Sequence, residues 1–199
     1  MRIRDLPLEW LLGAAGLIAV AVAVAAVVGF SVWRRYRARR ALLERIESVA
    51  TEYLMDVVLP DGNGGWFHVD FLLLTAAGLV VLDLRDLPGL IFGSEQMTEW
   101  TVMHKNQRST FPNPLGSLYD RVAVVRQLAG DTVPVEGRVV FTDRGTFPKG
   151  HPRSVTRLAS LATELPPLGP LGAEAARAHL GPAWERVRAA ASPSPLKRD

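Results

Sequence analysis

The sequence predicts an α/β domain, a mixed sheet with helices packed on it, preceded by one transmembrane helix. Three observations predict this architecture: an early uncharged apolar run, two apolar strands at 66–75 and 79–85, and a later strand, helix, strand order. The chain has 199 residues. Without an anchor about 160 remain, which is the size of one ordinary domain.

The composition excludes several classes of function. The chain contains no cysteine, so disulfides, thiolate metal sites and cysteine nucleophiles are excluded. It is 48% hydrophobic and 22% charged, which is typical of a folded chain rather than a disordered one. The formal net charge of +3 is small, and much of the excess lies in one cluster directly after the apolar run. Charge alone is therefore a weak argument for nucleic-acid binding.

The apolar run at 10–33 predicts the transmembrane helix, after a short tail at 1–9. No residue in it carries a formal charge, and Trp10 and Trp33 bracket it at the positions where interfacial tryptophans are favoured. About 20 apolar residues, at 1.5 Å each, span a hydrocarbon core of about 30 Å. A signal peptide is the competing interpretation, but its apolar core is usually only about 7–15 residues and ends in a cleavage site.

The basic residues predict the orientation. The run is preceded by two arginines and followed by five, namely Arg2 and Arg4 before it and Arg34, Arg35, Arg37, Arg39 and Arg40 after it. Because lysine and arginine are enriched on the cytoplasmic side, the N-terminus is expected outside and the soluble domain inside. The sequence thus predicts a single-pass protein of the inner membrane, with the lipid bilayer as a partner and the domain in the cytoplasm.

The remaining chain divides into three predicted segments. Residues 34–55 are a basic juxtamembrane segment and helix, because apolar residues recur there at helical spacing. Residues 56–165 form the main domain. It begins with an extended piece at 57–60 and a turn at 61–65, followed by the two strands and further short strands at 90–92 and 100–104.

The second half of that domain begins with a helix signal. Asn113 is suited to cap a helix and Pro114 to occupy its first position, and apolar residues line one face as far as Ala129. A buried strand at 137–143 and a short helix at 155–163 follow. Residues 166–199 are predicted to be a proline-rich break, a final helix at 173–191 and a tail.

Two acids interrupt the apolar strands and are the candidate site. Asp70 lies inside the first strand, and Asp83 lies near the end of the second, two residues before Arg85. Two carboxylates at strand ends can bind Mg²⁺, which uses one or two carboxylates with waters and phosphate oxygens. The alternative is that Asp83 pairs with Arg85 or Arg121 and that Asp70 caps a turn or is solvated, since a buried carboxylate needs a partner.

The run from Trp66 to Asp86 resembles the core of the NERD (nuclease-related) domain family. The resemblance extends through Gly89-Leu90-Ile91-Phe92-Gly93, Trp100 and Phe111-Pro112-Asn113-Pro114, and it covers about residues 41–143. It implies a restriction-endonuclease-like fold, in which an Asp and an Asp/Glu-x-Lys strand hold a divalent metal.

The resemblance assigns roles residue by residue. Asp70 matches the first acid, and Asp83-Leu84-Arg85 matches the Asp/Glu-x-Lys element. The preceding helix often supplies a further Glu, for which Glu44 and Glu47 both qualify. A Gln that often follows the Asn-Pro of the family is missing, and Ser117 stands in that neighbourhood as a candidate phosphate contact.

One departure from the family pattern bears on activity. Arg85 stands where the family has Lys, and arginine is always protonated, so it cannot act as a base. It can contact a phosphate, or pair with Asp83 or Asp70 and compete with a metal. The fold inference is therefore stronger than the inference of activity.

Other polar residues add weaker candidates. His68 precedes Asp70 by two positions and so shares its strand face, either as a site residue or as a hydrogen-bonded core histidine. Lys105 and Arg108, near Trp100 and His104, form a basic-aromatic patch that is suited to phosphate contact or is simply a solvated face.

Two hypotheses follow. In the first, a membrane-anchored NERD domain binds DNA or RNA and cleaves phosphodiesters with Mg²⁺, held by Asp70 and Asp83, while Arg85 contacts phosphate. In the second, the chain is a catalytically inactive binding or scaffold module at the cytoplasmic membrane face. The sequence leaves open whether the protein is an enzyme.

Overall fold

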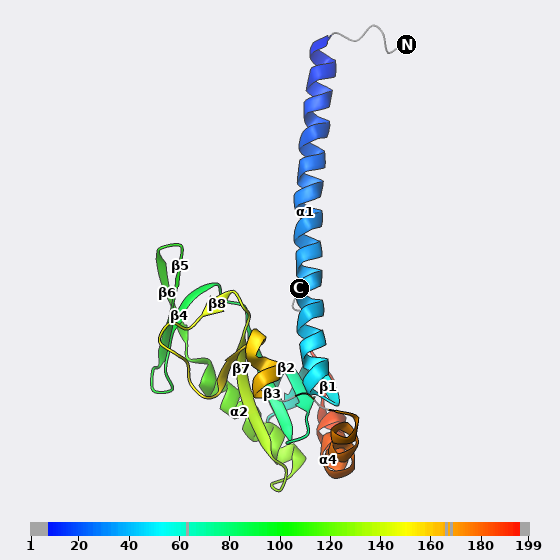
Figure 1. Ribbon diagram of the computed structural model, residues 1–199, viewed down its shortest axis with the longest axis vertical. Helices are drawn as coiled ribbons and strands as arrows, with labels where there is room; N and C mark the ends of the chain where they lie inside the picture. The colour runs from blue at the N-terminus through cyan, green and yellow to red at the C-terminus, as the bar shows by residue number, and fades with distance from the viewer. Residues whose placement is uncertain (1–7, 63, 166, 168, 196–199) are drawn as a thin grey trace. The chain divides into compact units, whose positions relative to one another are not determined.

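The computed structural model describes residues 8–62, 64–165, 167 and 169–195, without the side chains of 8–21, 23, 34, 35 and 38. The chain divides into two compact units, Met1–Leu43 and Glu44–Asp199. Helix α1 (Leu8–Val49) supplies the first unit and, with its last turns, the beginning of the second (Figure 1).

The predicted membrane placement is wrong for the part of the chain that the structure describes. No helix there is both long enough and apolar enough to cross a membrane. The side chains at 10–21 and 23 and the tail at 1–7 lie outside the described residues. A single-pass inner-membrane protein with a cytoplasmic domain, and the bilayer as its partner, are therefore not supported.

The second unit contains a mixed sheet, as predicted. Its strand order is β10-β1-β2-β3-β7-β9. The strands from β10 to β3 are antiparallel, whereas β3, β7 and β9 are parallel. The bounds are β1 (Glu52–Pro60), β2 (Trp66–Leu74), β3 (Leu79–Arg85), β7 (Val135–Phe141), β9 (Val155–Arg157) and β10 (Ser192–Pro193).

Both faces of this sheet are covered, which explains why β3 is apolar at consecutive positions. Helices α2 (Pro114–Ala129) and α4 (Pro170–Ala190) pack on one face, where Leu72, Val81 and Val139 join their core. On the other face, Tyr53 of β1 bonds to Glu47 at the end of α1. The 3-10 turn Leu158–Ser160 and the short helix α3 (Leu161–Glu164) follow β9. A strand buried on both faces needs no polar alternation.

A second, smaller sheet has the strand order β6-β5-β4-β8. Its strands are β4 (Gly89–Phe92), β5 (Glu99–His104), β6 (Gln107–Pro112) and β8 (Gly145–Thr146). Trp100 is fully buried and joins the two sheets, since its ring stacks on Phe141 of β7 and meets Phe111 and Phe147 edge-on. The sequence predicted two of these strands, but not that they form a separate sheet.

Three predicted boundaries are corrected. The juxtamembrane helix ends at Val49 rather than at 55, and β1 begins at Glu52 because its apolar residues pair with β2. The predicted short helix at 155–163 begins instead as strand β9, which pairs in parallel with β7. The C-terminal helix begins at Pro170, where the proline occupies the first turn, rather than at 173.

Candidate functional site

Three aspartates occupy one row across three neighbouring strands of the main sheet. Asp56 of β1 and Asp70 of β2 lie between two consecutive pairs of the β1–β2 ladder. The β2–β3 ladder ends at Phe71 and Leu82, so Asp70 and Asp83 are the next positions on their strands. Alternate residues of a strand share a face, so Asp70 and Asp83 face the same side as the paired Leu72 and Val81, which is the side covered by α2. The site is therefore the place where β2 and β3 separate.

Asp83 is buried and carries two ion pairs. Its side chain is 3% exposed. Its Oδ2 accepts a hydrogen bond from Arg85 Nη2 at 2.8 Å and another from Arg121 Nη1 at 3.1 Å. Both alternatives that the sequence offered for a paired Asp83 are thus realised together, and a buried carboxylate obtains the partners that its burial requires.

Arg121 connects three elements at this site. It extends from α2, and its Nε donates to the carbonyl oxygen of His68 on β2 at 2.6 Å. Its Nη1 also approaches the carbonyl and hydroxyl oxygens of Ser117, at 3.3 and 3.4 Å. Only 17% of its side chain is exposed. The guanidinium therefore fills the gap between the separating strands.

Asp70 takes part in a second polar group beside Asp83. Its Oδ2 accepts the backbone N–H of Leu84 at 2.8 Å, in place of a ladder bond. Its Oδ1 lies 3.5 Å from Nδ1 of His68, and Nε2 of His68 lies 2.6 Å from Oδ1 of Asp56. Asp56, which has a positive φ of 55°, was missed by the sequence reasoning. The only local signal was an acid inside an otherwise apolar strand.

These residues do not fit the Mg²⁺ site that the resemblance implies. The described residues contain no group of three or more histidines and acids able to hold a metal ion. Asp83 is already balanced by two permanent cations. Glu47, one of two candidates for a further ligand, accepts a hydrogen bond from Tyr53 of β1. Tyr53 pairs with Leu73, whose side chain points to the opposite face of the sheet from Asp70, so Glu47 lies on the other side from the aspartates. The other candidate, Glu44, joins no metal-binding group either.

The remaining predicted site residues separate into two places. Ser117 lies against Arg121, in the same polar cluster as Asp83 and Arg85. Lys105 and Arg108 lie instead on the β5–β6 hairpin of the second sheet. The structure records no contact between these two residues and the aspartates.

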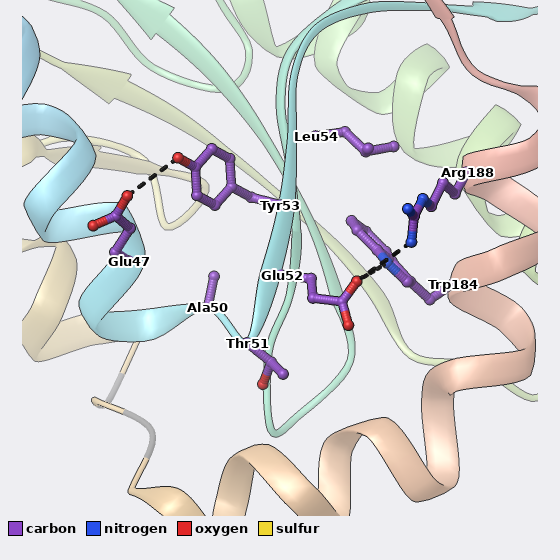
Figure 2. A pocket seen from close by; sticks show the side chains of 8 residues that line it. All are labelled: Glu47, Ala50, Thr51, Glu52, Tyr53, Leu54, Trp184 and Arg188. Carbon is purple, nitrogen blue, oxygen red and sulfur yellow. Dashed lines mark hydrogen bonds and ion pairs between the residues drawn. The ribbon is translucent and has the colours of Figure 1, made fainter.

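A separate pocket of about 380 Å³ lies at the start of β1, between the end of α1 and helix α4 (Figure 2). Glu52 accepts the indole N–H of Trp184 at 2.9 Å and lies 3.7 Å from Arg188. Across the pocket the Tyr53 hydroxyl donates to Glu47 at 3.2 Å. Burial, followed by the adjacent Glu47 carboxylate, raises the pKa of Tyr53 above its ordinary value. These pairings tie α4 and the end of α1 to β1.

Comparison with known proteins identifies the family. The model of the nuclease-related domain matches residues 34–142. An uncharacterized protein from Bacillus anthracis is 23% identical over 102 residues, which are 51% of this chain and 48% of that protein. The chain therefore spans about half the length of this curated relative. No solved structure matches this chain. Because the family model covers more than half of the chain and includes the aspartate row, this protein belongs to the nuclease-related domain (NERD) family.

Proposed function

We propose that this chain is a NERD module that binds nucleic acid without cleaving it by a divalent-metal mechanism. The observation that carries the proposal is the pairing of Asp83 with both Arg85 and Arg121. The nuclease-related family supports nucleic acid as the ligand. The proposal also includes the restriction-endonuclease-like fold that the resemblance implies for this family.

The electrostatics of the site argue against a metal. To bind Mg²⁺, the Asp83 carboxylate has to give up two charge-assisted hydrogen bonds. Arg121 then remains in a largely buried position without its counter-charge, a situation that costs about 3–5 kcal/mol in proteins. An ion bound to Asp83 would also be repelled by the guanidinium groups of Arg85 and Arg121, which both contact this carboxylate. The donor set therefore opposes cation binding.

The chemistry of the Asp83-Leu84-Arg85 element supports the same proposal. A lysine with a lowered pKa can move a proton, whereas an arginine stays protonated at every pH at which the protein folds. Arg85 is 38% exposed, so its guanidinium still reaches solvent while one nitrogen holds Asp83. Such a group can contact a phosphate oxygen but cannot activate a water molecule. This residue supports binding rather than hydrolysis.

The test measures binding and cleavage on the full chain under the same conditions. Fluorescence anisotropy with labelled single-stranded and duplex DNA and RNA is recorded in EDTA and in Mg²⁺ or Mn²⁺ at equal ionic strength. We expect equal affinity with and without the metal, intact substrate, and no heat of metal binding by calorimetry. The Asp83→Ala variant should also leave the substrate intact.

Two results would contradict the proposal. Metal-dependent cleavage that disappears in Asp83→Ala would show an active nuclease. The absence of binding to any of the four nucleic acids would remove nucleic acid as the ligand. Cleavage that persists when both Asp70 and Asp83 are replaced by alanine would come from a contaminant, so this double variant serves as the control for purity.

A further inference from the structure

We infer that the β5–β6 hairpin is the DNA-reading element of this protein and inserts into the major groove of a duplex. This inference deepens the proposed function and rests on it, because it names the form of nucleic acid and the element that binds it. The hairpin lies in the second sheet, at the side of the second unit away from β1 and β2 (Figure 1).

The hairpin is a regular two-stranded ribbon that leaves the core. Its ladder runs from the pair Glu99 and Pro112 to the pair His104 and Gln107, and two residues close the turn. The eight consecutive residues 103–110 are exposed, although Trp100 and Val102 further down the ribbon are buried. Strand β6 is the edge of its sheet. Both faces of the ribbon tip are thus free of other elements in the described structure.

The dimensions of this tip match the major groove of B-DNA. Beyond Val102, the strand continues for two residues, which span about 7 Å at about 3.4 Å per residue, and the two-residue turn extends the tip further. The major groove is about 8.5 Å deep and about 12 Å wide, and it admits a two-stranded β-ribbon. The major groove of A-form RNA is deep and narrow and does not admit side chains in this way. The geometry therefore favours duplex DNA.

The charge of the tip complements a phosphate backbone. Lys105 and Arg108 are exposed, and neither forms an ion pair with a residue that the structure describes. No acidic residue occurs between Trp100 and Tyr119. Asn106, Gln107 and Ser109 add amide and hydroxyl groups, which hydrogen-bond to base edges and phosphates. The tip thus combines two free cations with neutral hydrogen-bonding groups.

Lys105 lies in the turn of the hairpin and has a left-handed backbone conformation that is unfavourable for lysine. Lys105 and Asn106 have φ values of 47° and 62°, which is the pattern of a type I′ turn. Asn tolerates this left-handed conformation well, whereas a lysine there is strained. Backbone strain of this kind concentrates at functional positions. It supports a role for the Lys105 charge beyond closing the turn.

The experiment compares two charge-matched variants of the full chain. The hairpin variant, Lys105→Asn with Arg108→Gln, removes two charges and retains a residue suited to the turn. The control variant, Arg39→Gln with Arg153→Gln, removes two charges from exposed residues elsewhere. Circular dichroism verifies that each variant folds. Anisotropy titrations then measure affinity for duplex DNA, duplex RNA and single-stranded DNA between about 50 and 200 mM salt, the range over which affinity that depends on phosphate contacts falls steeply.

We expect the full chain to prefer duplex DNA over duplex RNA and single strands. The hairpin variant should bind duplex DNA about tenfold more weakly per lost contact at about 0.1 M salt, and its slope of log K against log salt should be shallower by about 2. The control variant should change both quantities much less.

The outcomes separate this inference from the proposed function. Equal losses in the two variants, or equal affinity for duplex RNA or single strands, would overturn the hairpin as a groove reader and leave nucleic-acid binding in place. A wild-type chain that binds no nucleic acid would overturn both. If a peptide captures β6 by strand addition while DNA does not bind, the hairpin is a protein-docking edge and the inference is wrong.

Discussion

Replacing Asp83 with asparagine distinguishes an ion-paired site from a metal site, because the two predict opposite signs. In a metal site without its ion, neighbouring carboxylates repel each other, so removal of one charge leaves stability unchanged or raises it. In the site observed here, the carboxylate balances Arg85 and Arg121. Its removal should destabilise the protein.

The size of the loss follows from burial rather than from distance. Asp83 is 3% exposed and Arg121 17%, so this pair behaves as a buried one, for which loss of one partner costs about 3–5 kcal/mol. Arg85 lies closer, at 2.8 Å, but is 38% exposed, and solvent screening limits its share to about 0.2–1 kcal/mol. Asparagine keeps one oxygen as an acceptor. We therefore expect Asp83→Asn to lower the free energy of unfolding by about 3 kcal/mol.

Urea denaturation of the full chain, followed by tryptophan fluorescence, measures this loss. The fluorescence of the buried Trp100 in β5 and Trp184 in α4 reports unfolding of the second sheet and of the helix that packs on the main sheet. Asp86→Asn is the matched control, since Asp86 is about half exposed and pairs with the exposed Arg144, and it should change stability by less than about 1 kcal/mol.

A double-mutant cycle then apportions the effect. The coupling between Asp83 and Arg121 should exceed that between Asp83 and Arg85, with glutamine as the replacement for each arginine. The reasoning is refuted if Asp83→Asn is as stable as the wild type or more stable. It is also refuted if Mg²⁺ raises the wild-type midpoint in a way that Asp83→Asn abolishes, because only a bound ion has that effect.

Three further predictions concern the frame around the site. The pKa of Tyr53 should lie above its ordinary value of 10.0, and Glu47→Gln should lower it by removing the adjacent carboxylate, as measured by phenolate absorbance. Because the pKa is raised in the folded state, the stability that Tyr53 contributes is present below pH 10 and is lost as the pH rises through the folded pKa. Asn113→Ala should lower the free energy of unfolding by about 2 kcal/mol in urea, since its side chain caps α2 and holds the preceding loop; an unchanged midpoint would contradict this. Gly93→Ala should cost about 1–3 kcal/mol in thermal denaturation, because a Cβ there overlaps the buried Trp100 ring, and a fully stable variant would show that the ring yields.

The parts of the fold with strong local signals were predictable from the sequence. The expected strands at 66–75 and 79–85 are observed as β2 and β3, nearly residue for residue. The Asn-Pro start of α2 is observed as well, with Asn113 accepting the backbone N–H of Leu115. Turns and caps are decided by a few adjacent residues, so a single sequence contains them.

The geometry of the site was less predictable, because it depends on register between distant segments. Arg121 lies 38 positions from Asp83, and only the seating of α2 on the sheet decides whether its guanidinium reaches that carboxylate. The sequence offered Arg85 and Arg121 as alternatives, since it could not show that both reach the same oxygen. Asp56 enters the site through the β1–β2 pairing, and the predicted helical boundary at 55 concealed that pairing.

Arg121, rather than Arg85, is the more buried of the two cations that pair with Asp83. Arg85 stands out in the sequence because the resemblance implies a lysine at its position, but its side chain is 38% exposed and water can replace its contact with Asp83. Arg121 is held by the carbonyl oxygen of His68 and by Ser117 in addition to Asp83, and only 17% of its side chain is exposed, so it is less free to turn away than Arg85. A lysine at position 85 would therefore still face an Asp83 neutralised from the helix side. We therefore expect that Arg85→Lys alone does not create Mg²⁺ binding while α2 keeps Arg121 beside Asp83, as calorimetry with Mg²⁺ would measure.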